Sequence, residues 1–257
     1  VPELRKRSGV SATAARQIES AAKRLAEIDA YRCGLNNRGI QIFTRFDDNY
    51  GHLLSELNDP PPLLYVRGTL PSPEEKSVTL IGTQNSTAEG ITLTTRLARQ
   101  FAAEPVQVVS SLNGGNDSAA HLGARGAGGR SFAVVESGLD TLDPQSQVPL
   151  AIDIAQTGGV ISEFSPEAAA SVKALEATDR LLVGITQATV ITELYHDSRR
   201  EYDILTFCNE IGKMVFVVVD DTLGPLADAE SVKHAAACGA ILLHGPQQAG
   251  DIARSLV

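Results

Sequence analysis

The chain has 257 residues, of which 43% are hydrophobic, and a net charge of −9 at pH 7. That length suffices for one large domain and a small one, and the apolar fraction suffices for a sizeable core. Charge is uneven, because residues 1–76 carry eleven Lys/Arg and ten Asp/Glu while residues 77–257 carry eleven and twenty-one. Diffuse attraction to nucleic acid is therefore not expected of the second part, where a polyanion needs a local basic patch.

Membrane proteins and disulfide-bonded proteins are not expected classes. No apolar run approaches the ~20 residues that span a bilayer, and residues 1–7 lack the apolar core of a signal peptide. Cys33, Cys208 and Cys238 are odd in number and widely spaced, without a CxxC pair. This pattern argues against a disulfide framework or a zinc site and indicates a cytoplasmic protein with no membrane partner.

The first 76 residues divide into two predicted parts. A small helical segment is expected over residues 1–38, with Ser11 as a plausible N-cap and apolar residues at helical spacing up to Ala30. Lead-in strands and a Pro-rich connector are expected over residues 39–76. The strands are predicted at 39–44 and 63–68, and a short helix at 52–57 ends before a run of prolines, which lack the N–H that a helix needs.

Residues 77–257 show a repeated alternation of strand and helix and form the predicted main domain. Several strands are continuous apolar runs, as expected when both faces of a sheet are covered. The handedness of strand–helix–strand crossovers then predicts an α/β fold with a doubly wound, mostly parallel sheet. The strands are predicted at 78–81, 106–110, 131–135, 159–162, 189–192, 214–219 and 240–243, and the helices near 88–103, 117–128, 146–157, 199–211, 229–238 and 247–256.

Two glycine-containing turns follow the first two strands of this domain. In open α/β sheets such turns, at the carboxyl ends of neighbouring strands, build the crevice that binds phosphate-bearing ligands through backbone N–H groups and helix N-termini. Thr87 is expected to cap the next helix. The residues predicted to contact phosphate or sugar in these two turns are Gly82, Thr83, Gln84, Ser86, Ser110, Ser111, Asn113, Gly114, Gly115 and Asp117.

Further candidates follow the later strands. Asp117 is expected to cap its helix more readily than to contact ligand, and His121, one turn on, to be held by that carboxylate rather than to act in catalysis. Gly138 is expected at the edge of the same crevice. Arg180 is the preferred phosphate contact, with an ion pair to Glu163 or Asp179 as an equally weighted alternative.

Familiar catalytic signatures are absent from the sequence. The first turn is not GxGxxG, and there is neither a GxxxxGK[ST] loop nor a GxSxG elbow. The five histidines are dispersed without metal-ligand spacing. We therefore expect a protein that is not an enzyme and that uses no cofactor and no metal.

Five segments, in order, resemble the DprA/Smf DNA-processing family. They are PPPLLYVRG at 60–68, LIGTQNSTAEG at 80–90, SSLNGGNDSAAH at 110–121, VVESGLD at 134–140 and GGVISE at 158–163. The resemblance implies an extended Rossmann-like domain, often dimeric, that binds single-stranded DNA and helps to load a RecA-type recombinase during natural transformation. No catalytic chemistry is attached to it.

The chain departs from the family pattern at charged positions. Gln84 stands where the family usually has Arg, and of a later basic motif only Arg180 matches. Each missing Arg removes a charge-assisted phosphate contact worth roughly 1.5–3 kcal/mol, so the resemblance implies weakened DNA binding. Two alternatives stay open: a nucleotide-binding protein like the Rossmann-like LOG proteins, and a non-binding dimeric scaffold for a protein partner.

Overall fold

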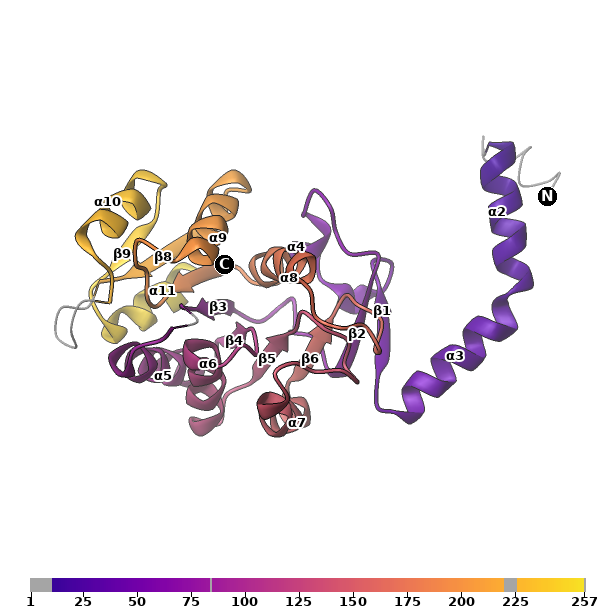
Figure 1. Ribbon diagram of the computed structural model, residues 1–257, viewed down its shortest axis with the longest axis horizontal. Helices are drawn as coiled ribbons and strands as arrows, with labels where there is room; N and C mark the ends of the chain where they lie inside the picture. The colour runs from indigo at the N-terminus through magenta and orange to yellow at the C-terminus, as the bar shows by residue number, and fades with distance from the viewer. Residues whose placement is uncertain (1–10, 84, 220–225, 257) are drawn as a thin grey trace. The chain divides into compact units, whose positions relative to one another are not determined.

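The computed structural model describes residues 11–83, 85–219 and 226–256, and its chain divides into two compact units, Val1–Gln41 and Ile42–Val257 (Figure 1). The sequence-based division at residues 38 and 76 stays a prediction. The described part of the first unit contains helices α2 (Ala12–Lys23) and α3 (Leu25–Asn37), where a small helical segment was expected. Ser11 caps α2 as predicted, because its side chain accepts a hydrogen bond from the Ala14 N–H at 3.2 Å.

Over its described residues, the second unit is built on a nine-stranded sheet in the order β1-β2-β6-β5-β4-β3-β7-β8-β9. Strands β3 to β9 pair in parallel, and β2 pairs antiparallel with β6, so the predicted doubly wound, mostly parallel sheet is confirmed. The strands are β1 (Gln41–Thr44), β2 (Leu63–Gly68), β3 (Ser77–Ile81), β4 (Gln107–Ser110), β5 (Ser131–Val134), β6 (Gly159–Ser162), β7 (Ala188–Ile191), β8 (Met214–Val218) and β9 (Ile241–Leu243).

Helices cover both faces of this sheet (Figure 1). One apolar cluster packs α5, α6 and α11 against residues such as Val78 and Leu80, and another packs α4, α8 and α9 against residues such as Ile81 and Ile191. Neighbouring residues of β3 thus enter opposite cores, which explains its continuous apolar run. The helices of this unit are α4 (His52–Ser55), α5 (Ala88–Ala103), α6 (Gly115–Gly126), α7 (Val148–Thr157), α8 (Val172–Gly184), α9 (Arg199–Glu210), α10 (Ala229–Ala237) and α11 (Ala249–Ser255).

Helix α8 was not predicted. It begins after Ser171, whose side chain accepts a hydrogen bond from the Ala174 N–H at 3.2 Å. It buries Ala174, Thr178 and Leu181, which share one helical face. The polar residues between them obscured that spacing, and no helix or strand was predicted over residues 172–184. Within the described residues, no helix combines the length and the apolar content that crossing a bilayer requires.

The order in which successive strands are added to the sheet changes side at β3. Strands β4, β5 and β6 extend the sheet on one side of β3, and β7, β8 and β9 extend it on the other. The strand order therefore has its switch point at β3, where Val78 pairs with Val108 of β4 and with Ala188 of β7. Ligands of open parallel sheets bind outside the carboxyl ends of the strands at such a point.

Candidate functional site

The two glycine-containing turns lie side by side at the carboxyl edge of the sheet. The turn after β3 leads into α5, and the turn after β4 leads into α6. They are joined by the backbone N–H of Asn116, which donates to Ser86 Oγ at 2.9 Å. The Ser86 hydroxyl itself donates to the carbonyl of Thr83 at 2.6 Å. The polar groups of Ser86 therefore hold the two turns together.

Close packing, rather than an approaching ligand, occupies the space beside Gly82. A Cβ at this position would lie 2.2 Å from Asn116 Nδ2 and 2.7 Å from Thr192 Oγ1. Glycine is needed there because side chains from α6 and from the end of β7 press against the backbone. Gln84, the most discriminating predicted contact of this turn, lies outside the described residues.

A buried carboxylate that was not predicted as a site residue lies at the end of β7. Glu193 is 0% exposed and accepts hydrogen bonds from both the backbone N–H and the hydroxyl of Thr87, at 3.2 and 2.6 Å. Asn116 Nδ2 and the Tyr195 hydroxyl donate to it at 2.5 and 3.2 Å. Thr87 caps α5 as predicted, by accepting from the Gly90 N–H at 2.9 Å. The polar donors that converge in the switch crevice are thus already hydrogen-bonded to the carboxylate of Glu193.

The second turn is similarly held by its own side chains. Ser110 Oγ donates to the carbonyl of Leu80 at 2.6 Å, and Ser111 Oγ donates to the carboxylate of Asp117. Gly114 and Gly115 have φ values of 92° and 49°, in the left-handed region that favours glycine. These glycines let the chain turn sharply from β4 into α6.

Asp117 does not cap α6, contrary to the sequence-based prediction. The helix begins earlier than expected, at Gly115, with Gly114 as N-cap, so Asp117 lies inside the first turn. Its buried carboxylate instead contacts Ser111 and Arg200, the latter at 3.3 Å. His121, which was expected to be held by Asp117, contacts Ser111 and Ser131 instead. These contacts support the expected structural role of this histidine.

His121 fixes the second turn from below. Its Nε2 lies 2.8 Å from the carbonyl of Ser111, an acceptor only, so this nitrogen carries the proton. Its Nδ1 then accepts from Ser131 Oγ at 2.7 Å. Burial lowers the pKa of His121 to about 4, so the ring is neutral near pH 7.

Arg200 of α9 is the cation at the centre of a buried acidic cluster. Its guanidinium lies 2.7 Å from Asp179 and 3.3 Å from Asp117, and only 10% of its side chain is exposed. Burial raises the pKa values of Asp179, Glu136 and Glu201, and the charge of Arg200 opposes each shift. Burial alone would lower the pKa of Arg200, but the surrounding carboxylates outweigh that effect and raise it. The cluster was missed because its members lie far apart in sequence.

Arg180 adopts the ion pair that was weighed as an alternative to phosphate contact. Its guanidinium lies 2.7 Å from Glu163 and donates to the carbonyl of Asp59. Gly138 is packed against backbone, since a Cβ there would lie 2.2 Å from the carbonyl oxygens of Ser165 and Pro166. Arg180 is thus engaged by Glu163 and Asp59, and Gly138 is enclosed by backbone. The side chain of Asn113 lies beside Glu136.

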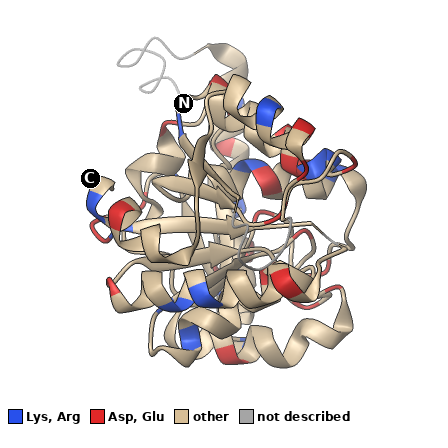
Figure 2. Ribbon diagram, turned by 90° about the vertical axis from the view of Figure 1, so that its left-hand side faces the viewer, with Lys and Arg blue, Asp and Glu red and all other residues tan. Residues whose placement is uncertain are grey.

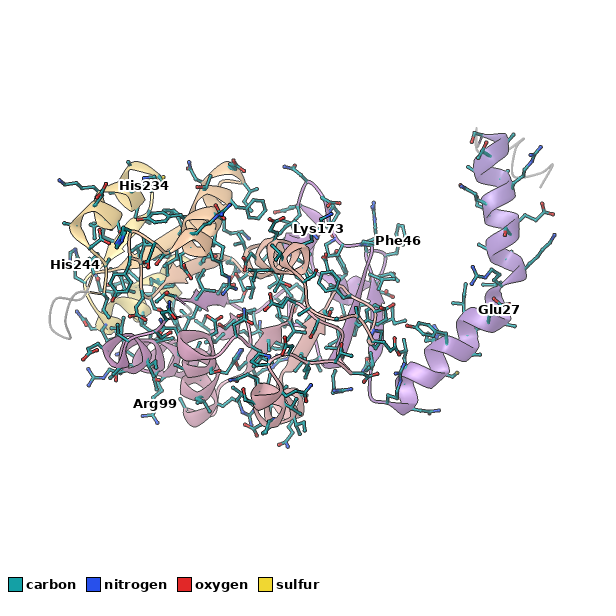
Figure 3. The ribbon with its side chains drawn as sticks, viewed as in Figure 1. Glu27, Phe46, Arg99, Lys173, His234 and His244 are labelled. Atoms are coloured by element: carbon teal, nitrogen blue, oxygen red, sulfur yellow. The ribbon has the colours of Figure 1, made fainter. Side chains whose placement is uncertain are left out.

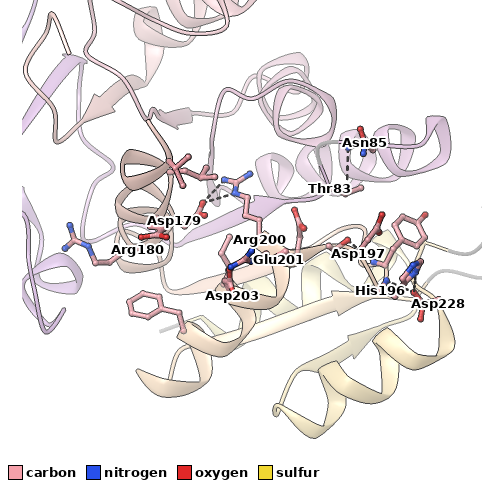
Figure 4. Close-up of a pocket in the computed structure, with 18 residues that line it drawn as sticks. Thr83, Asn85, Asp179, Arg180, His196, Asp197, Arg200, Glu201, Asp203 and Asp228 are labelled. Atoms are coloured by element: carbon pink, nitrogen blue, oxygen red, sulfur yellow. Dashed lines mark hydrogen bonds and ion pairs between the residues drawn. The ribbon is translucent and has the colours of Figure 1, made fainter. Parts of the chain in front are cut away.

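A groove of about 1020 Å³ runs outside the carboxyl edge, between the first turn and helices α8 and α9 (Figure 4). Thr83 and Arg180 are the predicted residues that line it. Its other lining residues are Asn85, Val172, Leu175, Glu176, Asp179, Tyr195, His196, Asp197, Ser198, Arg199, Arg200, Glu201, Asp203, Ile204, Phe207 and Asp228. Carboxylates outnumber arginines in this set, and Arg180 and Arg200 are paired, so Arg199 is the exposed cation of the lining.

Exposed basic and aromatic side chains also lie outside the groove lining. Phe46 is 85% exposed, and the Arg45 guanidinium lies 5.4 Å from the centre of its ring. Arg45 and Arg180 both act electrostatically on Tyr50, so they lie in the same neighbourhood. Lys173, exposed on α8, directly follows Val172 of the groove lining (Figure 3). We call Arg45, Phe46, Lys173 and Arg199 the basic rim. None of these four residues was a predicted site residue.

Comparison with known proteins gives one family across most of the chain. Residues 41–249 match the family described as DNA recombination-mediator protein A. Protein Smf of Synechocystis is 30% identical over 157 residues, which are 60% of this chain and 39% of that protein. DNA processing protein DprA of Streptococcus pneumoniae is 28% identical over 209 residues, 80% of this chain and 72% of that protein. The chain thus covers well under half of the first relative and nearly three quarters of the second.

Solved structures agree with this match. The crystal structure of DprA from Streptococcus pneumoniae superposes with a TM-score of 0.76 at 25% identity, over 92% of this chain and 81% of that one. A structure of DprA from Helicobacter pylori, described for its single-stranded DNA binding mode, gives a TM-score of 0.71 at 21% identity, over 84% of this chain and 98% of that one. The second likeness bears on the fold alone.

Proposed function

Because the chain belongs to the DNA recombination-mediator protein A family, we propose that it binds single-stranded DNA as an accessory protein of DNA recombination. The observation that carries this proposal is the match over residues 41–249, which includes the whole carboxyl edge of the sheet. Single-stranded DNA, the ligand of the Helicobacter pylori DprA whose fold this chain shares, is the ligand that we carry over in this proposal.

The proposed DNA path follows the basic rim and the groove rather than the interior of the switch crevice. Thr83 and Arg180 are the predicted contacts that line the groove, and a phosphate at Arg180 would compete with Glu163 for its guanidinium. Arg45, Lys173 and Arg199 are exposed and supply charge for phosphates, while Phe46 supplies a face for stacking a base. Ser86, Ser110, Ser111, Asn113, Gly114, Gly115 and Asp117 then shape the two turns from within.

The same proposal includes features that the family resemblance implies. We expect a cytoplasmic protein that dimerises, cooperates with a RecA-type recombinase in transformation and carries out no catalysis. Acidic lining and the net charge of −9 predict weak binding. The scaffold alternative applies if no DNA binds, because the turns are largely satisfied by their own side chains.

Fluorescence anisotropy with a labelled oligo-dT at low salt tests this function. Three phosphate contacts, from Arg45, Lys173 and Arg199, predict a slope of log affinity against log salt of about −2, at −0.7 per contact for single strands. Arg199→Ala should make that slope shallower by about 0.7. Absence of saturable binding below tens of micromolar refutes the proposal.

A matched control is available on the opposite side of the sheet. Arg99 is exposed on α5, away from Lys173 (Figure 3). Arg99→Ala removes the same net charge as Arg199→Ala, yet it should leave the salt slope unchanged. Equal effects of the two substitutions would show that net charge, and not the basic rim, sets the affinity. In the view of Figure 2, acidic and basic residues are interspersed, with no large region of one sign. A difference between Arg199→Ala and Arg99→Ala would therefore report a local contact with DNA.

A further inference from the structure

The start of helix α5 is where a parallel sheet of this topology binds the phosphate of a nucleotide. The helix has 16 residues, follows the central strand β3, and opens at the switch point of the strand order. Backbone N–H groups and the helix dipole at such a position favour an anion. In this chain the anion is internal, because the Glu193 carboxylate lies there with no exposed surface.

Four donor groups from three parts of the fold converge on that carboxylate. Oε1 accepts from the Thr87 hydroxyl at 2.6 Å, from the Thr87 N–H at 3.2 Å and from the Tyr195 hydroxyl at 3.2 Å. Oε2 accepts from Asn116 Nδ2 at 2.5 Å. Both carboxylate oxygens are therefore satisfied, as a buried charge requires.

The space beside Gly90 shows how closely the Glu193 carboxylate packs against α5. A Cβ at this first-turn position would lie 2.1 Å from Glu193 Cδ and 2.2 and 2.6 Å from its two oxygens. Such distances are shorter than any real contact of a Cβ atom, so a side chain at position 90 and the carboxylate compete for one space. The carboxylate fills the position directly over the start of α5.

We propose that Glu193 is a specificity-determining residue that closes the switch crevice to external phosphate groups. A phosphate entering there would meet a like charge and would have to displace four hydrogen bonds. The phosphates of mononucleotides and dinucleotides therefore do not bind at the start of α5, and a ligand of this chain must bind outside the switch crevice, along the groove. This inference does not depend on the DNA proposal, since it concerns an internal anion.

Anion rescue of a truncated side chain tests the proposal. Glu193→Ala leaves the converging donors without an acceptor, so the melting temperature should fall and formate should restore part of it. At about ten times its dissociation constant, formate should raise the melting temperature by on the order of 3–6 °C. The wild type should show no such response. If Glu193→Ala does not fold in plain buffer, its refolding yield against formate concentration gives the same readout.

Two further variants separate anion binding from general effects of salt. Gly90→Ala/Glu193→Ala places a methyl group where the carboxylate was, so formate should no longer stabilise it. Glu193→Gln keeps the volume but not the charge, and it should melt lower than the wild type without responding to formate. A formate response in Glu193→Ala no larger than in these two variants overturns the proposal.

Titration of the wild type with inorganic pyrophosphate completes the test. The proposal expects either no binding or binding whose dissociation constant is the same in Glu193→Gln, as for a site on the basic rim. Sub-millimolar binding that depends on residue 193 would overturn it. Failure of DNA binding leaves these outcomes unaffected, so the two proposals can fail separately.

Discussion

Substitution of Arg200 by methionine should destabilise the protein strongly, because the buried acidic cluster loses its cation. The guanidinium is 10% exposed and lies 2.7 Å from Asp179 and 3.3 Å from Asp117. Removing one partner of a buried ion pair costs about 3–5 kcal/mol, since the other charge stays buried and uncompensated. At 2–4 °C per kcal/mol for a chain of this size, the melting temperature should fall by roughly 6–20 °C.

The loss should also depend on pH, with a sign that follows from the raised pKa values of Asp179, Glu136 and Glu201. A carboxyl whose pKa is raised on folding holds more protons folded than unfolded, so its contribution to stability falls as pH rises from about 4 through the raised value. Arg200 opposes these shifts, and its removal raises the three pKa values further. The deficit of Arg200→Met should therefore be small near pH 4 and grow towards neutral pH.

Urea denaturation of both proteins at several pH values measures this deficit directly. Arg199→Met is the matched control, because Arg199 is the adjacent residue and is exposed; its unfolding free energy should stay within about 0.5 kcal/mol of wild type. Comparison of variants at each pH cancels groups outside the cluster. A deficit below about 1 kcal/mol at pH 7, or one that does not change with pH, would refute the assignment of Arg200 as the stabilising cation.

Three other outcomes are expected. His121→Gln should remove a loss of stability at acid pH. The pKa of His121 falls to about 4 on folding, so the unfolded wild type binds more protons than the folded one as pH falls below 6.5. Urea titrations at pH 4 and 7 should therefore show a loss of roughly 3 kcal/mol in the wild type that is absent from the variant. Phe46→Ala should weaken oligo-dT binding by about 1–3 kcal/mol through lost stacking and leave the melting temperature unchanged, since the ring is 85% exposed; equal binding by both proteins would exclude Phe46 from the interface. Gln84→Arg should restore a charge-assisted phosphate contact and tighten oligo-dT binding by about 1.5–3 kcal/mol in anisotropy titrations, whereas Gln84→Ala should have little effect.

The sheet could be predicted from sequence because its strands carry their own signal. Runs such as residues 78–81 and 214–218 are continuously apolar and end in turn residues, so both their extent and their burial follow from local pattern. Helix α8 lacked so clear a pattern, since Thr178 and Asp179 interrupt its apolar face. Arg180 was therefore assigned to no predicted element, although it lies on this helix and pairs with Glu163.

The chemistry of the candidate site was less predictable than its position. Hydroxyls and glycines in two turns indicated phosphate binding, but the same residue types can satisfy one another, and sequence spacing does not distinguish these outcomes. In the switch crevice, Glu193 accepts hydrogen bonds from Thr87, a partner that lies 106 residues away in sequence. The buried pairing of Arg200 with Asp117 spans 83 residues and was equally hidden.

The antiparallel placement of β2 has a consequence for how this chain acquires its structure during synthesis. Strand β2 is synthesised early, but Val66 can pair with Ile161 only after β6 has been synthesised. The central strand waits longer still, because Val78 lies beside Ala188. Apolar segments are thus left without partners over much of translation, and long-range pairing of this kind makes folding slow and vulnerable to aggregation. Nascent chains that stop before β7 should therefore engage chaperones rather than form a stable half-sheet.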